Sequence, residues 1–299
     1  MKAMTSYKCI VICIQERQMC VDLTLRELQM LAEYEHSIEE ARADLGSIVQ
    51  LYKNRDYWKE AIDVVFVKER QLPLQCALEH DIFFVKSDEI AVDIPEKLRH
   101  ESLGFVRGNR LVYAGRLVYP VKDIKGQVMG FCGWDKFEKP KYLDSKNNGY
   151  KAKDTTFYGM EKLENYYRDT KYLYVVEGIV CCLYLRSLGL NAIALLGSSI
   201  TKYVLEILKR FEGRIIFIPD NDIIGKTLED INKTFPAGEH IVTFVKRHIK
   251  RAIVIQSKLA KDVDDTRLLN NHEYEDSFIY DLKQVALCPF GNFKTIQLR

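Results

Sequence analysis

The sequence predicts an α/β fold in which a parallel sheet is flanked by helices. Three short apolar runs from Lys171 onward have the length and composition of buried strands: "YLYVVEG", "NAIALLG" and "RIIFIPD". Segments of helical character and about ten or more residues separate them. Strands that alternate with helices of this length form right-handed βαβ units, whose strands run parallel.

The helices between these strands have recognisable ends. The segment "IVCCLYLRSLG" stops at Gly189, which suits the position after a helix. The next helix, "SSITKYVLEILKRFEG", has Ser198 or Ser199 as its predicted N-cap and Gly213 beyond its end. A third helix is predicted over "IGKTLEDINKTFPAG". Residues 239–265 fit either two strands or a helix end and one strand, and "EYEDSFIYDLKQVAL" predicts a helical tail.

The chain before Lys171 has a different character. Apolar residues recur at three- and four-residue steps over residues 22–54, which predicts one long amphipathic helix. More helix is predicted over 56–85, with a break near Pro73. From Arg107 the residues favour β-structure, and the polar link "DIKGQ" between "LVYPV" and "VMGFCGW" predicts a β-hairpin. The following segment, "DKFEKPKYLDSKNNGYKAKDTTFYG", is expected to be a loop.

Composition narrows the functional classes only slightly. The 299 residues are 47% hydrophobic and 29% charged, which is an ordinary globular balance, and the net charge of +2 leaves any basic surface local. No apolar run approaches a membrane span, and the N-terminus does not resemble a signal peptide. The eight cysteines form no CxxC pair and are expected to be buried thiols in a reducing cytosol, although Cys9, Cys13 and Cys20 leave a metal site open.

Acidic residues follow two of the predicted strands. Glu177 ends the first strand of the βαβ region, and Asp220 and Asp222 end the third. Ligands of parallel α/β sheets collect beyond the carboxyl ends of strands, so these carboxylates are expected to converge. Clustered carboxylates repel one another unless a cation neutralises them, and oxygen ligands favour Mg²⁺ or Mn²⁺.

A second acidic pair follows the apolar run "AIVIQ". Asp262 and Asp264 in "KDVDD" are predicted to add ligands for a second cation, and two cations suit phosphoryl transfer. Each of these acidic motifs alone is common in turns and solvated loops. Their order at successive strand ends is what favours a metal site.

A basic segment precedes the acidic one. Between residues 136 and 153 the lysines outnumber the acids and two tyrosines interleave, a pattern that suits backbone contact and base stacking. The candidate nucleic-acid or nucleotide contacts are Arg116, Lys139, Lys141, Tyr142 and Lys153. A second basic strip, residues 246–261, is either another phosphate contact or an exposed face.

These motifs resemble a known family. The strand-end pair Glu177–Gly178, the turn Gly197–Ser199, and Asp220–Asp222 followed by Gly225 resemble a Toprim domain, the metal-dependent module of primases, topoisomerases and some nucleases. The segment "GRLVYPVKDIKGQVMGFCGW" is similar to the basic subdomain of DnaG-type primases, and "KPKYLDS" resembles a Lys-Tyr-Leu-Asn-Ser motif of that family. The resemblance places Lys153 at a lysine of the basic cleft.

The resemblance implies an organisation and two departures from it. The resemblance covers about residues 60 to 265, and together with the helical patterns outside it predicts four segments: an N-terminal mainly helical segment over 1–100, a mixed α+β basic subdomain over 101–170, a Toprim catalytic domain over 171–270 and a helical tail over 271–299. Cys181 stands where the family has an acidic residue, which affects the number of metals. The zinc-ribbon cysteines usual at the start of the family are absent, so either a separate protein recognises the template or initiation is less sequence-selective.

The implied activity is DNA-templated synthesis of short RNA primers on single-stranded DNA from ribonucleoside triphosphates. Glu177, Asp220 and Asp222 would be catalytic and would hold Mg²⁺ or Mn²⁺, with Glu177 as a general base in an alternative role. The implied setting is a cytoplasmic replisome, of a phage or mobile element, with a replicative helicase as partner. Two rival functions are a Toprim-type nuclease and a nonenzymatic DNA-binding replication factor.

Overall fold

A five-stranded parallel sheet forms the C-terminal part of the molecule. The computed structural model describes residues 8–14, 17–23, 25–145, 156–169, 171–197, 200–220, 245, 247–249, 252–256, 262–268, 272–287 and 295–297. The strands lie in the order β10-β9-β11-β12-β13, and every neighbouring pair is parallel. They are β9 (Tyr172–Val176), β10 (Ala192–Ala194), β11 (Arg214–Ile218), β12 (Ala252–Gln256) and β13 (Thr295–Gln297). The α/β class with a parallel sheet is thus confirmed.

The strand order changes direction at the centre of this sheet. From β9 the chain moves first to β10 on one side, and then to β11, β12 and β13 on the other. In open parallel sheets a crevice forms outside the carboxyl ends of the two strands at which the order reverses. Here those strands are β9 and β11, the two that precede Glu177 and Asp220.

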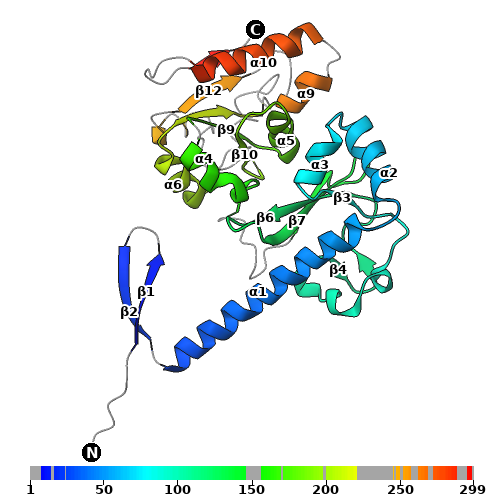
Figure 1. Cartoon of the computed structure of the whole chain (residues 1–299), viewed down its shortest axis with the longest axis vertical. Helices are drawn as coiled ribbons and strands as arrows, with labels where there is room; N and C mark the ends of the chain where they lie inside the picture. Colours follow the sequence, from blue (N-terminus) through cyan, green and yellow to red (C-terminus); the bar gives the residue numbers. More distant parts are fainter. Residues whose placement is uncertain are drawn as a thin grey trace, which may run out of the picture.

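Helices lie around this parallel sheet (Figure 1). Thr201 caps α6, because its side chain accepts a hydrogen bond of 3.3 Å from the Val204 amide. The N-cap predicted at Ser198 or Ser199 is therefore wrong, and those two serines lie outside the described residues. Gly189 follows α5 with φ of +77°, as predicted for a position that a side chain would strain. The helices are α4 (Leu163–Asp169), α5 (Ile179–Ser187), α6 (Lys202–Arg210), α9 (Val263–Leu268) and α10 (His272–Leu287).

A four-stranded antiparallel sheet, in the order β3-β6-β7-β8, forms the middle of the chain. Its strands are β3 (Phe83–Phe84), β6 (Leu117–Lys122), β7 (Val128–Trp134) and β8 (Tyr142–Asp144). The predicted hairpin is β6–β7. The segment expected to be entirely loop also contains β8, which pairs with β7. A smaller pair consists of β4 (Val106–Arg107) and β5 (Arg110–Leu111).

The N-terminal part is helical where the apolar spacing predicts it. Helix α1 (Leu25–Lys53) buries Leu45, Ile48 and Tyr52 against the antiparallel sheet. The helix predicted over 56–85, with a break near Pro73, is observed as α2 (Trp58–Ile62), a π-helix η1 (Asp63–Glu69) and α3 (Leu74–Glu79). The prediction is wrong at its end, where Phe83 and Phe84 form strand β3 and pair with β6. The described residues that follow include the short 3₁₀ segments η2 (Ala91–Asp93), η3 (Glu96–Leu98), η4 (Glu101–Leu103) and η6 (Met160–Lys162).

Two further features were not predicted from the sequence. Strands β1 (Lys8–Ile14) and β2 (Arg17–Leu23) form an antiparallel pair within a segment expected to be mainly helical. Their β-branched residues favour strands, which explains the difference. Strand β13 adds an edge to the parallel sheet beyond the helical tail. No helix in the described ranges has the length and apolar character needed to cross a membrane.

A buried arginine on α5 joins the parallel sheet to the rest of the chain. The Arg186 guanidinium donates to the Ala192 carbonyl (2.9 Å) and to Oε1 of Glu161 (3.1 Å), and its Nη1 lies 3.4 Å from Nδ1 of His80. Gly159 has φ of +99°, and a Cβ there would lie 2.3 Å from Nη2 of the arginine. Glycine at this position therefore leaves the space that the guanidinium occupies.

We expect Arg186→Met to lower the free energy of unfolding by about 3 kcal/mol, because it leaves the largely buried Glu161 carboxylate without its cation. Lys209→Met is the matched control. Lys209 pairs with Glu206 on the solvent-facing side of α6, and such surface pairs contribute at most about 1 kcal/mol to stability. Urea denaturation of both variants measures the difference. Equal effects of the two substitutions would contradict the importance of the Arg186 junction.

The His80 imidazole predicts a pH dependence of stability. Burial, with Arg186, Lys122 and Lys162 nearby, lowers its pKa to about 3 despite the opposing effect of Asp81. The unfolded chain therefore binds a proton near the ordinary pKa of about 6.5 that the folded chain does not bind. The stability linked to His80 is present above that value and is lost as the pH falls toward 3.

We expect wild-type protein to lose more stability than His80→Gln between pH 7 and pH 4, by a few kcal/mol, since one pKa unit corresponds to about 1.4 kcal/mol. Denaturant unfolding at several pH values gives the two slopes. Parallel slopes would show that His80 titrates in the same range in the folded and unfolded chain.

Candidate metal centre and nucleic-acid interface

The register of the central strands brings Glu177 and Asp220 together. Val176 at the end of β9 pairs with Ile218 at the end of β11, so the residues that follow leave the sheet side by side. The amide of Asp220 donates a hydrogen bond of 3.0 Å to Oε1 of Glu177. The carboxylate of Glu177 is thereby oriented by the backbone of the neighbouring strand end.

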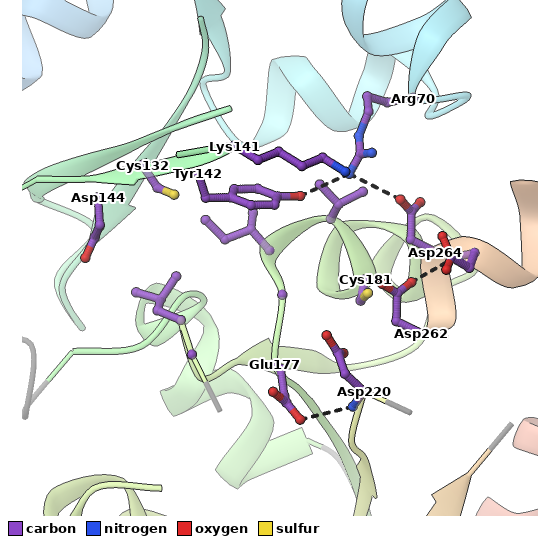
Figure 2. Close-up of a pocket in the computed structure, with 16 residues that line it drawn as sticks. Arg70, Cys132, Lys141, Tyr142, Asp144, Glu177, Cys181, Asp220, Asp262 and Asp264 are labelled. Carbon is purple, nitrogen blue, oxygen red and sulfur yellow. Dashed lines mark hydrogen bonds and ion pairs between the residues drawn. The ribbon is translucent and has the colours of Figure 1, made fainter. Parts of the chain in front are cut away.

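Three side chains from different elements converge beside this pair. The Sγ atom of Cys181 on α5 and carboxylate oxygens of Asp220 and Asp262 all lie within 4.8 Å of one another. Figure 2 shows the Asp220 carboxylate directed toward Cys181 and Asp262. Asp262 precedes α9, and its Oδ1 accepts from the Asp265 amide at 2.9 Å. Two carboxylates and a thiol at this spacing fit a divalent cation, since all three are metal ligands.

The electrostatics of Cys181 follow from this placement. The residue is only 4% exposed. Burial, and then the carboxylates of Asp262 and Asp220, raise the pKa of the thiol well above its ordinary value. A cation among these groups would reverse the repulsion that disfavours the thiolate.

Asp264 takes a different partner from Asp262. Its Oδ2 lies 3.2 Å from Nη2 of Arg70, and both side chains are buried. The same guanidinium donates to the Tyr142 hydroxyl at 3.2 Å and stacks 4.6 Å from the ring of Trp134. Figure 2 shows Arg70 between Tyr142 and Asp264. Arg70 therefore connects the acidic edge of the parallel sheet with β7 and β8.

These groups line one pocket of about 530 Å³. Acidic side chains from the parallel sheet form one wall, and Lys141 with Tyr142 lies on the other (Figure 2). The lining residues are Arg70, Cys132, Lys141, Tyr142, Asp144, Glu177, Gly178, Ile179, Val180, Cys181, Leu196, Gly197, Asp220, Asp262, Asp264 and Asp265. The pocket thus offers ligands for a cation and positive charge for an anionic substrate.

Arg116 lies behind the basic loop. The side chain is buried, and its Nη1 donates to the carbonyls of Pro140 (3.1 Å) and Lys141 (3.4 Å). The sequence analysis expected Arg116 to contact template or triphosphate. In the structure its described contacts hold the loop backbone, while Lys139 and Lys141 are exposed on it. Sequence alone does not distinguish these roles, because both use a cationic side chain in a basic segment.

Apart from Arg116 and Lys139, the predicted site residues divide into three groups. Glu177, Asp220 and Asp262 lie together with Cys181, and Lys141 and Tyr142 line the same pocket. Asp264 lies there too, but paired with Arg70. Asp222 and Lys153 lie outside the described residues. The sequence analysis did not single out Arg70, since a lone arginine near the end of a helical segment carries no signal.

Comparison with known proteins finds DNA primases among the similar sequences and structures. Residues 65–164 match the family model of the DNA primase catalytic core, N-terminal domain. A DNA primase of Clostridium acetobutylicum is 31% identical over 199 residues, which cover 60% of this chain and 33% of the relative. A DNA primase of Aquifex aeolicus is 24% identical over 279 residues, covering 82% and 56%. The chain thus spans between about a third and just over half of these two relatives.

Solved structures show the same fold. The RNA polymerase domain of Mycobacterium tuberculosis primase DnaG superposes with a TM-score of 0.62 at 18% identity, with 82% of each chain covered. A DnaG primase catalytic domain bound to single-stranded DNA gives 0.62 at 20% identity, with coverage of 85% of this chain and 82% of that one. In sequence and in fold, this chain is therefore similar to the catalytic core of DnaG-type DNA primases.

Proposed function

We propose that this chain synthesises short RNA primers on single-stranded DNA by metal-dependent nucleotidyl transfer. The observation that supports this most is the pocket in which Asp220, Asp262 and Cys181 converge opposite Lys141 and Tyr142. Acidic ligands for a cation face a cationic and aromatic wall, an arrangement suited to a triphosphate and a nucleic-acid strand. The relatives are DNA primases and the similar structures are domains of DnaG primases, and we extend that activity to this chain.

The residues of the pocket would act mainly by positioning and charge neutralisation. Glu177, Asp220 and Asp262 would hold Mg²⁺ or Mn²⁺, with Asp222 adjacent in sequence. A bound divalent cation supplies a Lewis acid that neutralises triphosphate oxygens. Asp264 would contribute through its pair with Arg70, which holds the acidic edge of the parallel sheet next to β8.

The basic wall would hold the template. Lys141 and Lys139 extend from the loop that Arg116 supports, and Tyr142 presents a ring that is 41% exposed. Lysines that contact phosphates and aromatic rings that stack on bases are the usual means of binding single strands. We include Lys153 in this surface from its place in the family pattern. Arg116 would act by positioning the loop.

Glu177→Gln and Asp220→Asn are expected to reduce primer synthesis at least about a hundredfold, since even outer partners of a metal site typically change activity about 10- to 100-fold. The assay combines single-stranded template, labelled ribonucleotides and Mg²⁺ or Mn²⁺, and gels resolve the products. Asp276→Asn on exposed α10 is the matched control and should retain synthesis.

Each outcome of this assay bears on the function. Oligoribonucleotide products that depend on Glu177 support a primase. Template fragments in place of products would show a nuclease. DNA binding without any metal-dependent reaction, in wild type and variants alike, would show a nonenzymatic binding factor.

Lys141→Ala is expected to weaken binding of single-stranded DNA and to reduce the salt dependence. Each phosphate contact contributes about 0.7 to the slope of log affinity against log salt for single strands. Fluorescence anisotropy at several salt concentrations measures this slope. Lys283→Ala, on exposed α10, is the control and should leave it unchanged. The same slope for Lys141→Ala and wild type would remove Lys141 from the template contact.

A further inference from the structure

The candidate metal site contains a sulfur atom. Cys181 is the third residue of α5, and its Sγ shares a cluster with carboxylate oxygens of Asp220 and Asp262, all within 4.8 Å of one another. Metal–sulfur and metal–oxygen bonds are about 2.3 and 2.1 Å, so two ligands of one ion lie at most about 4.4 Å apart. Modest side-chain movement therefore brings all three atoms onto one cation.

The neighbouring cysteine shows that this placement is specific to Cys181. Cys182 is fully buried, and its thiol donates to the Ala192 carbonyl at 3.3 Å, on the side of α5 that packs on the sheet. Successive residues of an α-helix point about 100° apart, so the two thiols face different surroundings. Only Cys181 of this pair lines the acidic pocket.

A thiolate ligand changes which cations a site prefers. Mg²⁺ is a hard ion that favours oxygen and binds sulfur poorly. Thiolate ligands favour Zn²⁺ and other first-row transition-metal ions of similar softness. A site with two carboxylates and one thiolate thus differs in selectivity from a site made of carboxylates alone.

We propose that Cys181 is a direct metal ligand and that this pocket prefers Co²⁺ or Zn²⁺ to Mg²⁺. The inference rests on the proposed metal site and specifies its cation. The thiol releases its proton to solvent when the metal–sulfur bond forms. Asp220 and Asp262 complete the described ligand set, and Glu177 lies beside it through its bond from the Asp220 amide.

Cobalt provides a test that does not depend on catalysis, because a thiolate bound to Co²⁺ gives a charge-transfer absorption in the near ultraviolet. Metal-free full-length protein is titrated with Co²⁺ under reducing conditions, and equilibrium dialysis measures bound metal in parallel. We expect the absorption to appear in wild type and in Cys182→Ser. In Cys181→Asp and Cys181→Ser this absorption should be absent when one Co²⁺ per chain is bound. Any absorption that these variants still show comes from other cysteines and is the background.

Competition with Mg²⁺ measures the selectivity. Cys181→Asp restores an all-carboxylate site, so Mg²⁺ should displace Co²⁺ more easily from this variant than from wild type. The ratio of the Co²⁺ and Mg²⁺ affinities is expected to fall at least about tenfold, the smallest change that outer partners of a metal typically cause. Circular dichroism confirms that each variant is folded.

Two results would overturn the inference. One is Co²⁺ that binds wild type without the charge-transfer absorption. The other is an absorption that persists unchanged in the Cys181 variants. Either leaves primer synthesis by a carboxylate site intact. Conversely, the protein could show the expected absorption and make no primers with any cation. That result would contradict the proposed function and still support Cys181 as a metal ligand.

Discussion

The buried Arg186 guanidinium is the interaction on which the arrangement of this molecule depends. From α5 it contacts Glu161, the first residue of β10 and His80, which follows α3. Removing such a charge from water is costly unless every partner is in place, so the contacts tolerate little relative movement. Because α5 also carries Cys181, the same helix sets both the junction and the pocket.

A second guanidinium extends this constraint to the site. Arg70 pairs with Asp264, contacts the Tyr142 hydroxyl and stacks on Trp134. Its partners lie on α9, β8 and β7, and all three elements are distant from Arg70 in the sequence. Arg70 neutralises Asp264. Asp262, two residues earlier in the chain, instead lies with Cys181 and Asp220. The acidic and basic walls of the pocket are therefore held at a defined separation by a side chain that belongs to neither.

Local patterns in the sequence predict much of the fold. The alternation of strands and helices after Lys171, the end of α5 at Gly189 and the β6–β7 hairpin all follow from periodicity and turn residues. The convergence of Glu177 and Asp220 could be predicted because parallel strand ends share an edge. The partners of Arg70, the pairing of β13 with β12 and the burial of Arg116 could not, since each depends on contacts between distant segments.

The strand order described above also determines when the pocket can exist during folding. The β6–β7 hairpin pairs neighbours in sequence and can form early. Asp262 reaches Cys181 and Asp220 only after β12 has docked beside β11, which requires closing a long crossover. Loop closure of this kind is slow compared with local pairing. A partly folded or incompletely synthesised chain therefore lacks the assembled cluster of Asp220, Asp262 and Cys181, and a cation that needs all three ligands could bind only after β12 has docked.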